Sequence, residues 1–359
     1  MKAVVYEGPR AVSVKDVPEA RIERPTDVLV KITTTNNLTT PDDPRMAGAA
    51  YGFADIGPLR RQAGRTAALP YGDHNSPVVP EEAGGRQTDY VMLSDIFPTG
   101  RHVTELACVR PGDTVVLYGA GPVGCVAALS ATLKSAGKVL ISDLHPDRLS
   151  LVEQIGAIPI HDSKGPIDQV KHTNGLGADR GCACVGYQAH EPQGNEHPDM
   201  TLNHLVQPVK FTGTTGVVGV FIPRGPRRPG PMYREGEAAF AHGMLGFRVQ
   251  NIGNGQTSVK AYNEQLYGLI RAGKAEPSWI VSHELVVNKA ADGYTDTSTS
   301  MPATTAGRRS SSPGGQLSLT ARRHALGAPS PALPSRSRKG TRTGPAGCPR
   351  RSHRTTSDS

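Results

Sequence analysis

Three glycines near the centre of the chain have the spacing of a turn that can hold a phosphate. Residues 114–118, TVVLY, form an apolar run that predicts a buried strand and leads directly into GAGPVG. In that hexapeptide, Gly119 permits a tight turn, Gly121 lets the backbone approach a pyrophosphate, and Gly124 lets a helix pack closely on a strand. The helix that follows offers free N–H groups and the positive end of its dipole to the phosphates.

The flanking segments fit a dinucleotide-binding unit. Residues 122–137 predict a helix in which Pro122 occupies the first turn, where proline is tolerated. A second apolar strand, 138–142, ends at Asp143, which lies 24 residues after Gly119 and is placed to accept hydrogen bonds from the adenosine ribose. An acid there favours NAD over NADP. The predicted cofactor-binding residues are Gly119, Gly121, Pro122, Val123, Gly124, Asp143, Arg148, Val185 and Val220.

Arg148 has three open interpretations. Its guanidinium can stack on adenine, it can accept the 2′-phosphate of NADP, or it is a solvated charge in the first turn of a helix. The sequence alone does not choose between them.

Strands and helices continue to alternate after this unit. Helices are expected at 147–157, 167–173, 200–210 and 258–274, and strands at 158–162, 179–186, 215–221 and 247–253. This order predicts an α/β fold with a parallel sheet covered on both faces, of the Rossmann type. Cys182 and Cys184 share one face of a predicted strand, and we interpret them as small core residues in preference to a metal or redox pair.

The C-terminal residues have a different composition. Residues 295–359 contain no aromatic side chain and hold eleven Lys and Arg against two Asp, a net charge of +9. Because the whole chain carries +8, the first 294 residues carry about −1, and the basic character belongs to the tail. Such a composition predicts disorder. The tail can attract phosphates without specificity, but it has no aromatic side chain to stack on bases, so no specific nucleic-acid partner is expected.

Cell location and size are also constrained by the sequence. The 359 residues suffice for two domains, and no apolar run is long enough to cross a membrane. The start, MKAVVYEGPR, has no apolar region typical of a secretion signal. Five cysteines at irregular spacing are typical of a reducing compartment. We therefore expect a cytoplasmic protein without a membrane partner.

Several stretches resemble a known family. The opening 1–36 has the alternating short strands of a small barrel, and with GAGPVG it resembles the zinc-type, medium-chain alcohol dehydrogenases. Residues 89–100 (DYVMLSDIFPTG), 184–194 (CVGYQAHEPQG) and 278–285 (SWIVSHEL) resemble the glutathione-independent formaldehyde dehydrogenases of that superfamily. The resemblance implies a GroES-like catalytic barrel, a Rossmann domain that binds NAD, a small alcohol or aldehyde as substrate, a catalytic zinc ion and a homo-oligomer.

The zinc-ligand block of that family is missing from this chain. In the family, C-G-S-D-x-H and later G-H-E follow the stretch that reads TTTN here at 33–36, and four further cysteines hold a structural zinc. Here no cysteine precedes Cys108 and no histidine precedes His74. Of the family ligands, the resemblance leaves Asp95, and one carboxylate does not hold zinc. His102 is a candidate proton relay at the remnant of the substrate cleft, or a structural histidine.

The resemblance also sets the expected domain boundaries. Residues 1–98 correspond to a truncated catalytic domain, 99–275 to the Rossmann domain, 276–294 to a return segment and 295–359 to the disordered tail. The family continues after 290–295 with a closing strand, which a one-base change of reading frame can restore from suitable codons. We interpret the tail as a frameshift product. Two functions remain open: an NAD-dependent alcohol or formaldehyde dehydrogenase, and a catalytically inactive NAD-binding remnant.

Overall fold

The fold is known from a computed structural model. It describes residues 1–8, 11–22, 24–25, 27–31, 66–69, 72, 76, 79, 85–161, 175–187, 189–221, 236–282, 285, 287–289 and 291. By its internal contacts the chain divides into residues 1–301 and 302–359, and all described residues belong to the first unit. The expected tail and the expected helix at 167–173 lie outside the described residues.

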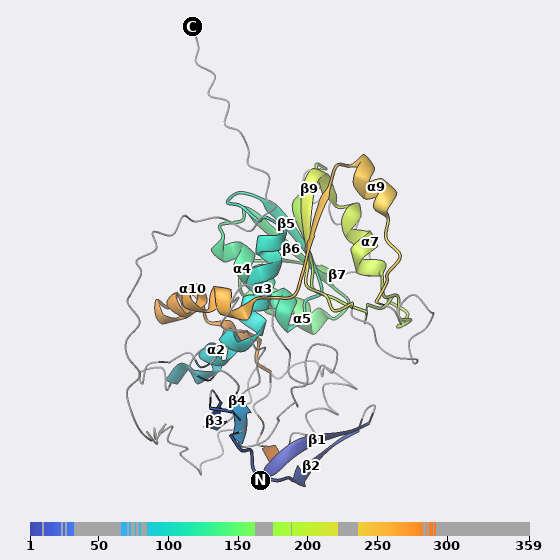
Figure 1. Cartoon of the computed structure of the whole chain (residues 1–359). Coiled ribbons are helices and arrows are strands. Elements are labelled where there is room, and N and C mark those ends of the chain that lie inside the picture. The colour runs from blue at the N-terminus through green and yellow to red at the C-terminus, as the bar shows by residue number, and fades with distance from the viewer. Residues whose placement is uncertain are drawn as a thin grey trace. The chain divides into compact units, whose positions relative to one another are not determined.

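A six-stranded parallel sheet forms the centre of the described chain (Figure 1). Its strands are β5 (Thr114–Tyr118), β6 (Lys138–Asp143), β7 (Ile158–His161), β8 (Ala178–Ala183), β9 (Val209–Val217) and β10 (Asn251–Asn254). The strand order is β10-β9-β8-β5-β6-β7, and every neighbouring pair is parallel. This is the doubly wound order of a Rossmann fold, in which the direction of strand addition reverses between β5 and β8. The α/β prediction is confirmed.

Helices cover both faces of this sheet, as the alternating sequence predicted. They are α2 (Gln87–Val91), α3 (Ile96–Leu106), α4 (Pro122–Leu133), α5 (Pro146–Glu153), α7 (Met200–Val206), α9 (His242–Phe247) and α10 (Val259–Arg271), with short 3₁₀ segments η3 (Met92–Ser94), η6 (Pro277–Ile280) and η7 (Val287–Lys289). Alternate residues of β5 point to opposite faces: Val115 and Leu117 pack with α3, α4 and α5, whereas Val116 and Tyr118 pack with α7.

Two of the expected strands have other bounds in the structure. The strand expected at 215–221 is β9, which begins at Val209 and ends at Val217. The strand expected at 247–253 is β10, and Phe247 ends helix α9 instead. A turn separates the two elements: Val249 has a positive φ of 53°, and the N–H of Gln250 donates to the carbonyl of Leu245 (3.0 Å). The β-branched and aromatic residues of FRVQ favour a strand locally, but this tertiary turn prevails.

The expected domain boundary at 98/99 falls inside a helix. Helix α3 runs through it without a break, and its Phe97 is fully buried beside Val126 of α4 and Leu266 of α10. Arg86, just before α2, donates to the carbonyls of Ile270 (2.8 Å) and Ala275 (3.3 Å). Residues 85–98 therefore pack as part of the Rossmann unit.

The described strands near the N-terminus form two separate antiparallel pairs. Strand β1 (Lys2–Gly8) pairs with β2 (Ala11–Asp16), and β3 (Val28–Lys31) pairs with β4 (Thr66–Leu69). Three of these strands lie in the stretch 1–36 for which short strands were expected, and the barrel itself stays a prediction. The segment from which the zinc ligands are missing lies outside the described residues.

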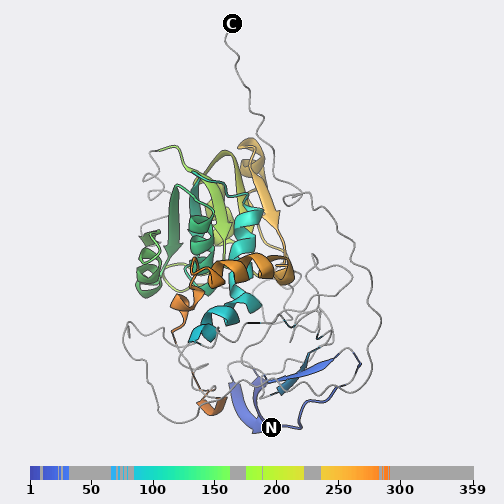
Figure 2. The ribbon, with the colours of Figure 1, turned by 90° about the vertical axis from the view of Figure 1, so that its left-hand side faces the viewer.

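Helices α3 and α10 are joined by a half-buried polar contact. The His102 Nδ1 lies 2.7 Å from the Tyr262 hydroxyl, and the two rings meet edge to face, where α10 runs across α3 (Figure 2). Burial lowers the pKa of His102, and the nearby Glu105 carboxylate opposes this shift. Burial also raises the pKa of Tyr262 to about 12. Burial therefore favours a neutral His102 imidazole in the folded chain.

Glycine 124 provides a test of the helix–strand packing. A Cβ at this position would lie 1.6 Å from the Gly119 carbonyl oxygen, whereas a Cβ at Gly121 would meet nothing within 4 Å. We expect Gly124→Ala to lower the unfolding free energy by about 1–3 kcal/mol because backbone must move. Gly121→Ala, the matched control, should cost less than about 1 kcal/mol. Urea denaturation measures both, and equal losses would contradict the packing.

The His102 contact predicts a dependence of stability on pH. Because the folded state lowers the pKa of His102, the unfolded chain binds the proton more tightly, so stability is full above about pH 6.5 and falls as pH drops below it. In His102→Gln this titration is lost. The stability difference between the two proteins in urea should therefore shrink between about pH 7.5 and pH 5.5. A difference that stays constant over this range would refute the assignment.

Candidate dinucleotide site

The glycine-rich turn lies at the carboxyl end of β5, where the sheet reverses its winding. Gly119 has a φ of 93°, and its N–H donates to the carbonyl of Ser142 at the end of β6 (2.8 Å). Gly121 caps α4 in an extended conformation, and Pro122 is the first residue of the helix. The first N–H groups of a helix have no partner within it, and a Cβ on Gly121, just before the helix, would meet nothing within 4 Å. Gly119 makes the tight turn and Gly124 makes the close helix–strand packing that the sequence predicted, and the pyrophosphate role of Gly121 stays a prediction.

Asp143 ties this turn to the next strand. Its Oδ2 accepts a hydrogen bond from the N–H of Ala120 (2.7 Å), and its Oδ1 accepts one from the N–H of His145 (2.9 Å). The sequence predicted a ribose acceptor at this position but not these contacts with the turn and with the start of α5. An ionised carboxylate has about four acceptor positions, so capacity for ribose hydroxyls remains.

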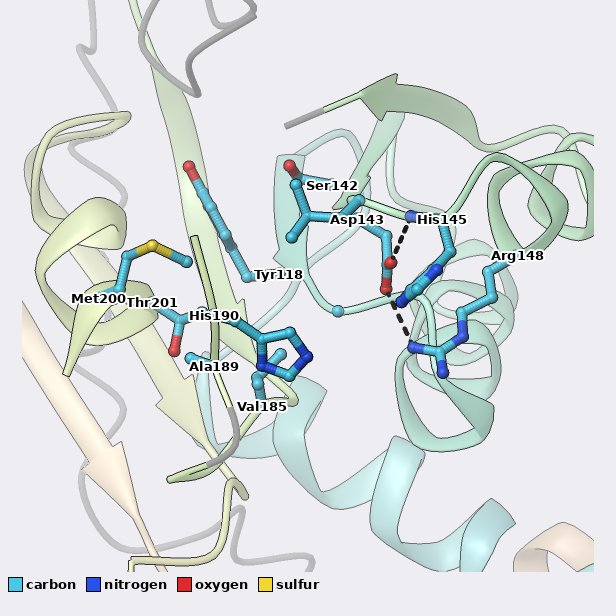
Figure 3. Close-up of a pocket in the computed structure, with 12 residues that line it drawn as sticks. Tyr118, Ser142, Asp143, His145, Arg148, Val185, Ala189, His190, Met200 and Thr201 are labelled. Carbon is cyan, nitrogen blue, oxygen red and sulfur yellow. Dashed lines mark hydrogen bonds and ion pairs between the residues drawn. The ribbon is translucent and has the colours of Figure 1, made fainter. Parts of the chain in front are cut away.

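Beside the turn lies a small cavity. It has a volume of about 90 Å³ and is lined by Tyr118, Gly119, Ser142, Asp143, Leu144, His145, Arg148, Val185, Ala189, His190, Met200 and Thr201. Figure 3 shows Asp143, His145 and Arg148 along one side, with Val185 and His190 across from them. In doubly wound sheets, ligands bind at this switch point, outside the carboxyl ends of the strands.

All but one of the predicted cofactor-binding residues lie at the cavity or at the start of the helix beside it. Gly119, Asp143, Arg148 and Val185 line the cavity, and the remaining residues of the turn, 121–124, start the adjoining helix. Val220 does not line the cavity. It is about half exposed, and its carbonyl accepts a hydrogen bond from the N–H of Tyr187 (3.2 Å).

Sequence reasoning missed several residues of the cavity wall. Leu144 and His145 directly follow Asp143 at the end of β6. Because ligands of doubly wound sheets bind beyond the carboxyl ends of the strands, these two residues could have been predicted from the sequence. His190, Met200 and Thr201 come from the segment after β8, and only the tertiary structure places them here. Among the described residues, Thr201 is buried and its hydroxyl has no hydrogen-bond partner.

Arg148 lies in the first turn of α5, beside Asp143. Its Nη1 lies 3.7 Å from Asp143 Oδ2, and its side chain is 30% exposed. The three interpretations of this residue stay predictions.

The residues linked to zinc do not form a metal site in the described chain. Asp95 begins α3 and accepts a hydrogen bond from the Thr99 hydroxyl (2.9 Å), and burial raises the pKa of its carboxyl. His102 lies on α3 against Tyr262, away from the cavity lining. Within the described residues, no three His, Cys, Asp or Glu side chains are grouped to hold a metal ion. These residues therefore do not fit a zinc ion.

Cys182 and Cys184 pack in the apolar core, as the sequence predicted. Cys182 is fully buried in the cluster beneath α3 and α4, and Cys184 packs against the same cluster. Burial raises the pKa of the Cys182 thiol to about 12 and that of Cys184 well above its usual value, so both stay protonated.

Comparison with known proteins places this site in a family. No family model matches the chain. The chain is 33% identical over 266 residues to a glutathione-independent formaldehyde dehydrogenase of Bacillus subtilis, covering 71% of this chain and 64% of that protein. It is 30% identical over 278 residues to the enzyme of the same name from Pseudomonas aeruginosa. That match covers 72% of this chain and 68% of the Pseudomonas protein. A formaldehyde dismutase of Pseudomonas putida is 31% identical, covering 75% and 69%.

Solved structures agree on the fold. An alcohol dehydrogenase from Thermus sp. ATN1 superposes with a TM-score of 0.64 at 24% identity, covering 82% of this chain and 96% of that one. A zinc-dependent alcohol dehydrogenase 2 from Streptococcus pneumonia gives 0.62 at 22% identity, covering 83% and 94%. No helix in the described part of the chain has the length and apolar character of a membrane span.

The chain spans about two thirds of the length of the curated relatives that it matches. Over that span the identity is 30–33%. The chain belongs to the zinc-type, medium-chain alcohol dehydrogenase family, among the relatives of the glutathione-independent formaldehyde dehydrogenases.

Proposed function

We propose that this protein binds NAD at the turn between β5 and α4. The observation that carries the proposal is the arrangement of Gly119, Gly121 and Asp143 at the switch point of the sheet. Gly121 leaves open space at the N-terminus of α4, where a pyrophosphate meets free N–H groups and the positive end of the helix dipole.

The cavity receives the adenosine end of the cofactor. Asp143 accepts hydrogen bonds from the ribose hydroxyls, while its contacts with Ala120 and His145 fix its orientation. Val185 and Met200 supply apolar surface for the base. The cavity, at about 90 Å³, is too small for a whole dinucleotide, so the pyrophosphate lies over the open turn.

NAD, when bound, supplies a nicotinamide ring that accepts a hydride. In the family, zinc polarises the oxygen of the substrate alcohol or aldehyde hydrate. The described residues do not fit that metal, and we assign no step to it. The proposed function is therefore NAD binding without the zinc-dependent chemistry.

A second candidate function is NAD-dependent oxidation of a small alcohol or aldehyde hydrate. The similarity to two formaldehyde dehydrogenases and one formaldehyde dismutase favours it. The two candidates differ in metal content and turnover. One equivalent of tightly held zinc per chain, together with NADH formation from formaldehyde or ethanol, would establish the second candidate and exclude the first.

NAD should bind to the purified protein and raise its melting temperature, with zinc content near zero. Gly121→Ala should weaken NAD binding by about tenfold or more because a methyl group enters the space where the pyrophosphate approaches. Calorimetric titration with NAD measures the affinity, and metal analysis measures zinc. The small stability cost expected for this variant separates lost binding from lost folding. Unchanged NAD affinity in Gly121→Ala would contradict the placement of the pyrophosphate.

Asp143 should make the protein prefer NAD over NADP. A 2′-phosphate would lie near its carboxylate, and Asp143→Asn removes the charge while keeping an oxygen for the Ala120 N–H. In this variant we expect the dissociation constant of NADP divided by that of NAD to fall by about tenfold, which means a weaker preference for NAD. Fluorescence titration with both cofactors measures the ratio. Equal affinities in the unmodified protein would show that Asp143 does not face the ribose.

A further inference from the structure

One wall of the cavity belongs to a small hairpin between β8 and α7, residues 189–197. Its two arms meet in an antiparallel bridge between His190 and Glu196, and the N–H of His197 donates to the carbonyl of Ala189 (2.8 Å). Ala189 and His190 line the cavity from this hairpin (Figure 3). The shape of the wall therefore depends on how the hairpin is held against the rest of the site.

The side chain of His197 joins this hairpin to the start of α7. Its Nδ1 lies 3.4 Å from Oε1 of Glu191 on the other arm, and its Nε2 lies 3.4 Å from Oδ1 of Asp199, just before the helix. Its carbonyl accepts a hydrogen bond from the N–H of Met200 (3.0 Å), a residue of the cavity lining. The ring is half-buried, whereas Asp199 is buried. A titratable ring thus lies between two segments that form the wall.

Protonation changes what this ring can bind. A neutral imidazole has one N–H donor and one lone pair, so it can donate to one carboxylate while its lone pair faces the other. An imidazolium has two N–H donors and can bind both carboxylates at once. An unperturbed histidine side chain titrates at about pH 6.5, so the change falls near neutral pH.

We propose that His197 is a positioning residue that couples cofactor affinity to pH. Its protonated ring binds Glu191 and Asp199 together and fixes the hairpin on the start of α7. This sets the wall before the cofactor arrives, so less ordering is left to accompany binding. NAD therefore binds more tightly as the pH falls through the range in which histidine titrates. The inference rests on the proposed NAD function and adds its regulation by protons.

Other ionisable groups belong to the same elements or to the cavity. The hairpin also carries His190 and Glu196, and α7 carries His204, whose ring packs edge to face on Tyr118. His145 lines the cavity from the segment after β6. All of these stay in place when His197 alone is replaced. The difference in pH dependence between the two proteins therefore reports on His197.

The test compares the unmodified full-length protein with His197→Gln, which has no titratable ring. Calorimetric titration with NAD gives the dissociation constant at about pH 8 and about pH 6. The tightening of NAD binding between these two values should be about threefold larger in the unmodified protein, because partly exposed ion pairs contribute modestly. Glu191→Gln removes one of the two carboxylates and should give an intermediate tightening. His242→Gln removes an exposed histidine at the start of α9, outside the cavity lining, and should match the unmodified protein.

A purely structural role for His197 predicts a different result. If the ring only packs within the hairpin, His197→Gln weakens NAD binding by the same factor at both pH values. That outcome, or an unchanged affinity at both, overturns the inference while leaving NAD binding intact. Failure of the unmodified protein to bind NAD at either pH overturns the proposed function itself. A thermal melt shows that each variant is folded, and Glu191→Gln decides the question where His197→Gln is unstable.

Discussion

A methyl group on residue 124 would lie 1.6 Å from the carbonyl oxygen of Gly119, so α4 meets the end of β5 with backbone against backbone. This contact fixes the start of the helix over the switch point of the sheet. The positive φ of Gly119 turns the chain into that position, and Pro122 starts the helix immediately afterwards. The N–H groups at the head of α4 consequently face the place where the sheet order reverses, which is where a doubly wound sheet binds its ligand.

Asp143 extends this arrangement to the neighbouring strand and helix. By accepting from the N–H groups of Ala120 and His145, its carboxylate links the turn after β5 to the segment that leads into α5. The same carboxylate forms an ion pair with Arg148, whose Nη1 lies 3.7 Å from Asp143 Oδ2. The Asp143 side chain therefore affects both the backbone geometry and the charge at this end of the sheet.

The core beneath the site is built to hold these backbone positions. Valine and leucine residues of β5 alternate between two apolar clusters, so the strand is anchored on both faces. A third cluster joins Phe97 of α3 to α4 and α10, and the guanidinium of Arg86 satisfies the carbonyls of Ile270 and Ala275 beyond it. The segment 85–98, which the family resemblance assigned to another domain, thus supports the Rossmann unit.

The sequence by itself determined the strand–turn–helix unit, the acid at the end of the second strand and the α/β class. These depend on local patterns: apolar runs, glycine spacing and a first-turn proline act over a few residues. Only the tertiary structure decided that His190, Met200 and Thr201 reach the cavity and that Arg148 turns back onto Asp143. It also decided that FRVQ ends a helix and that His102 bonds Tyr262, because those outcomes depend on contacts with distant parts of the chain.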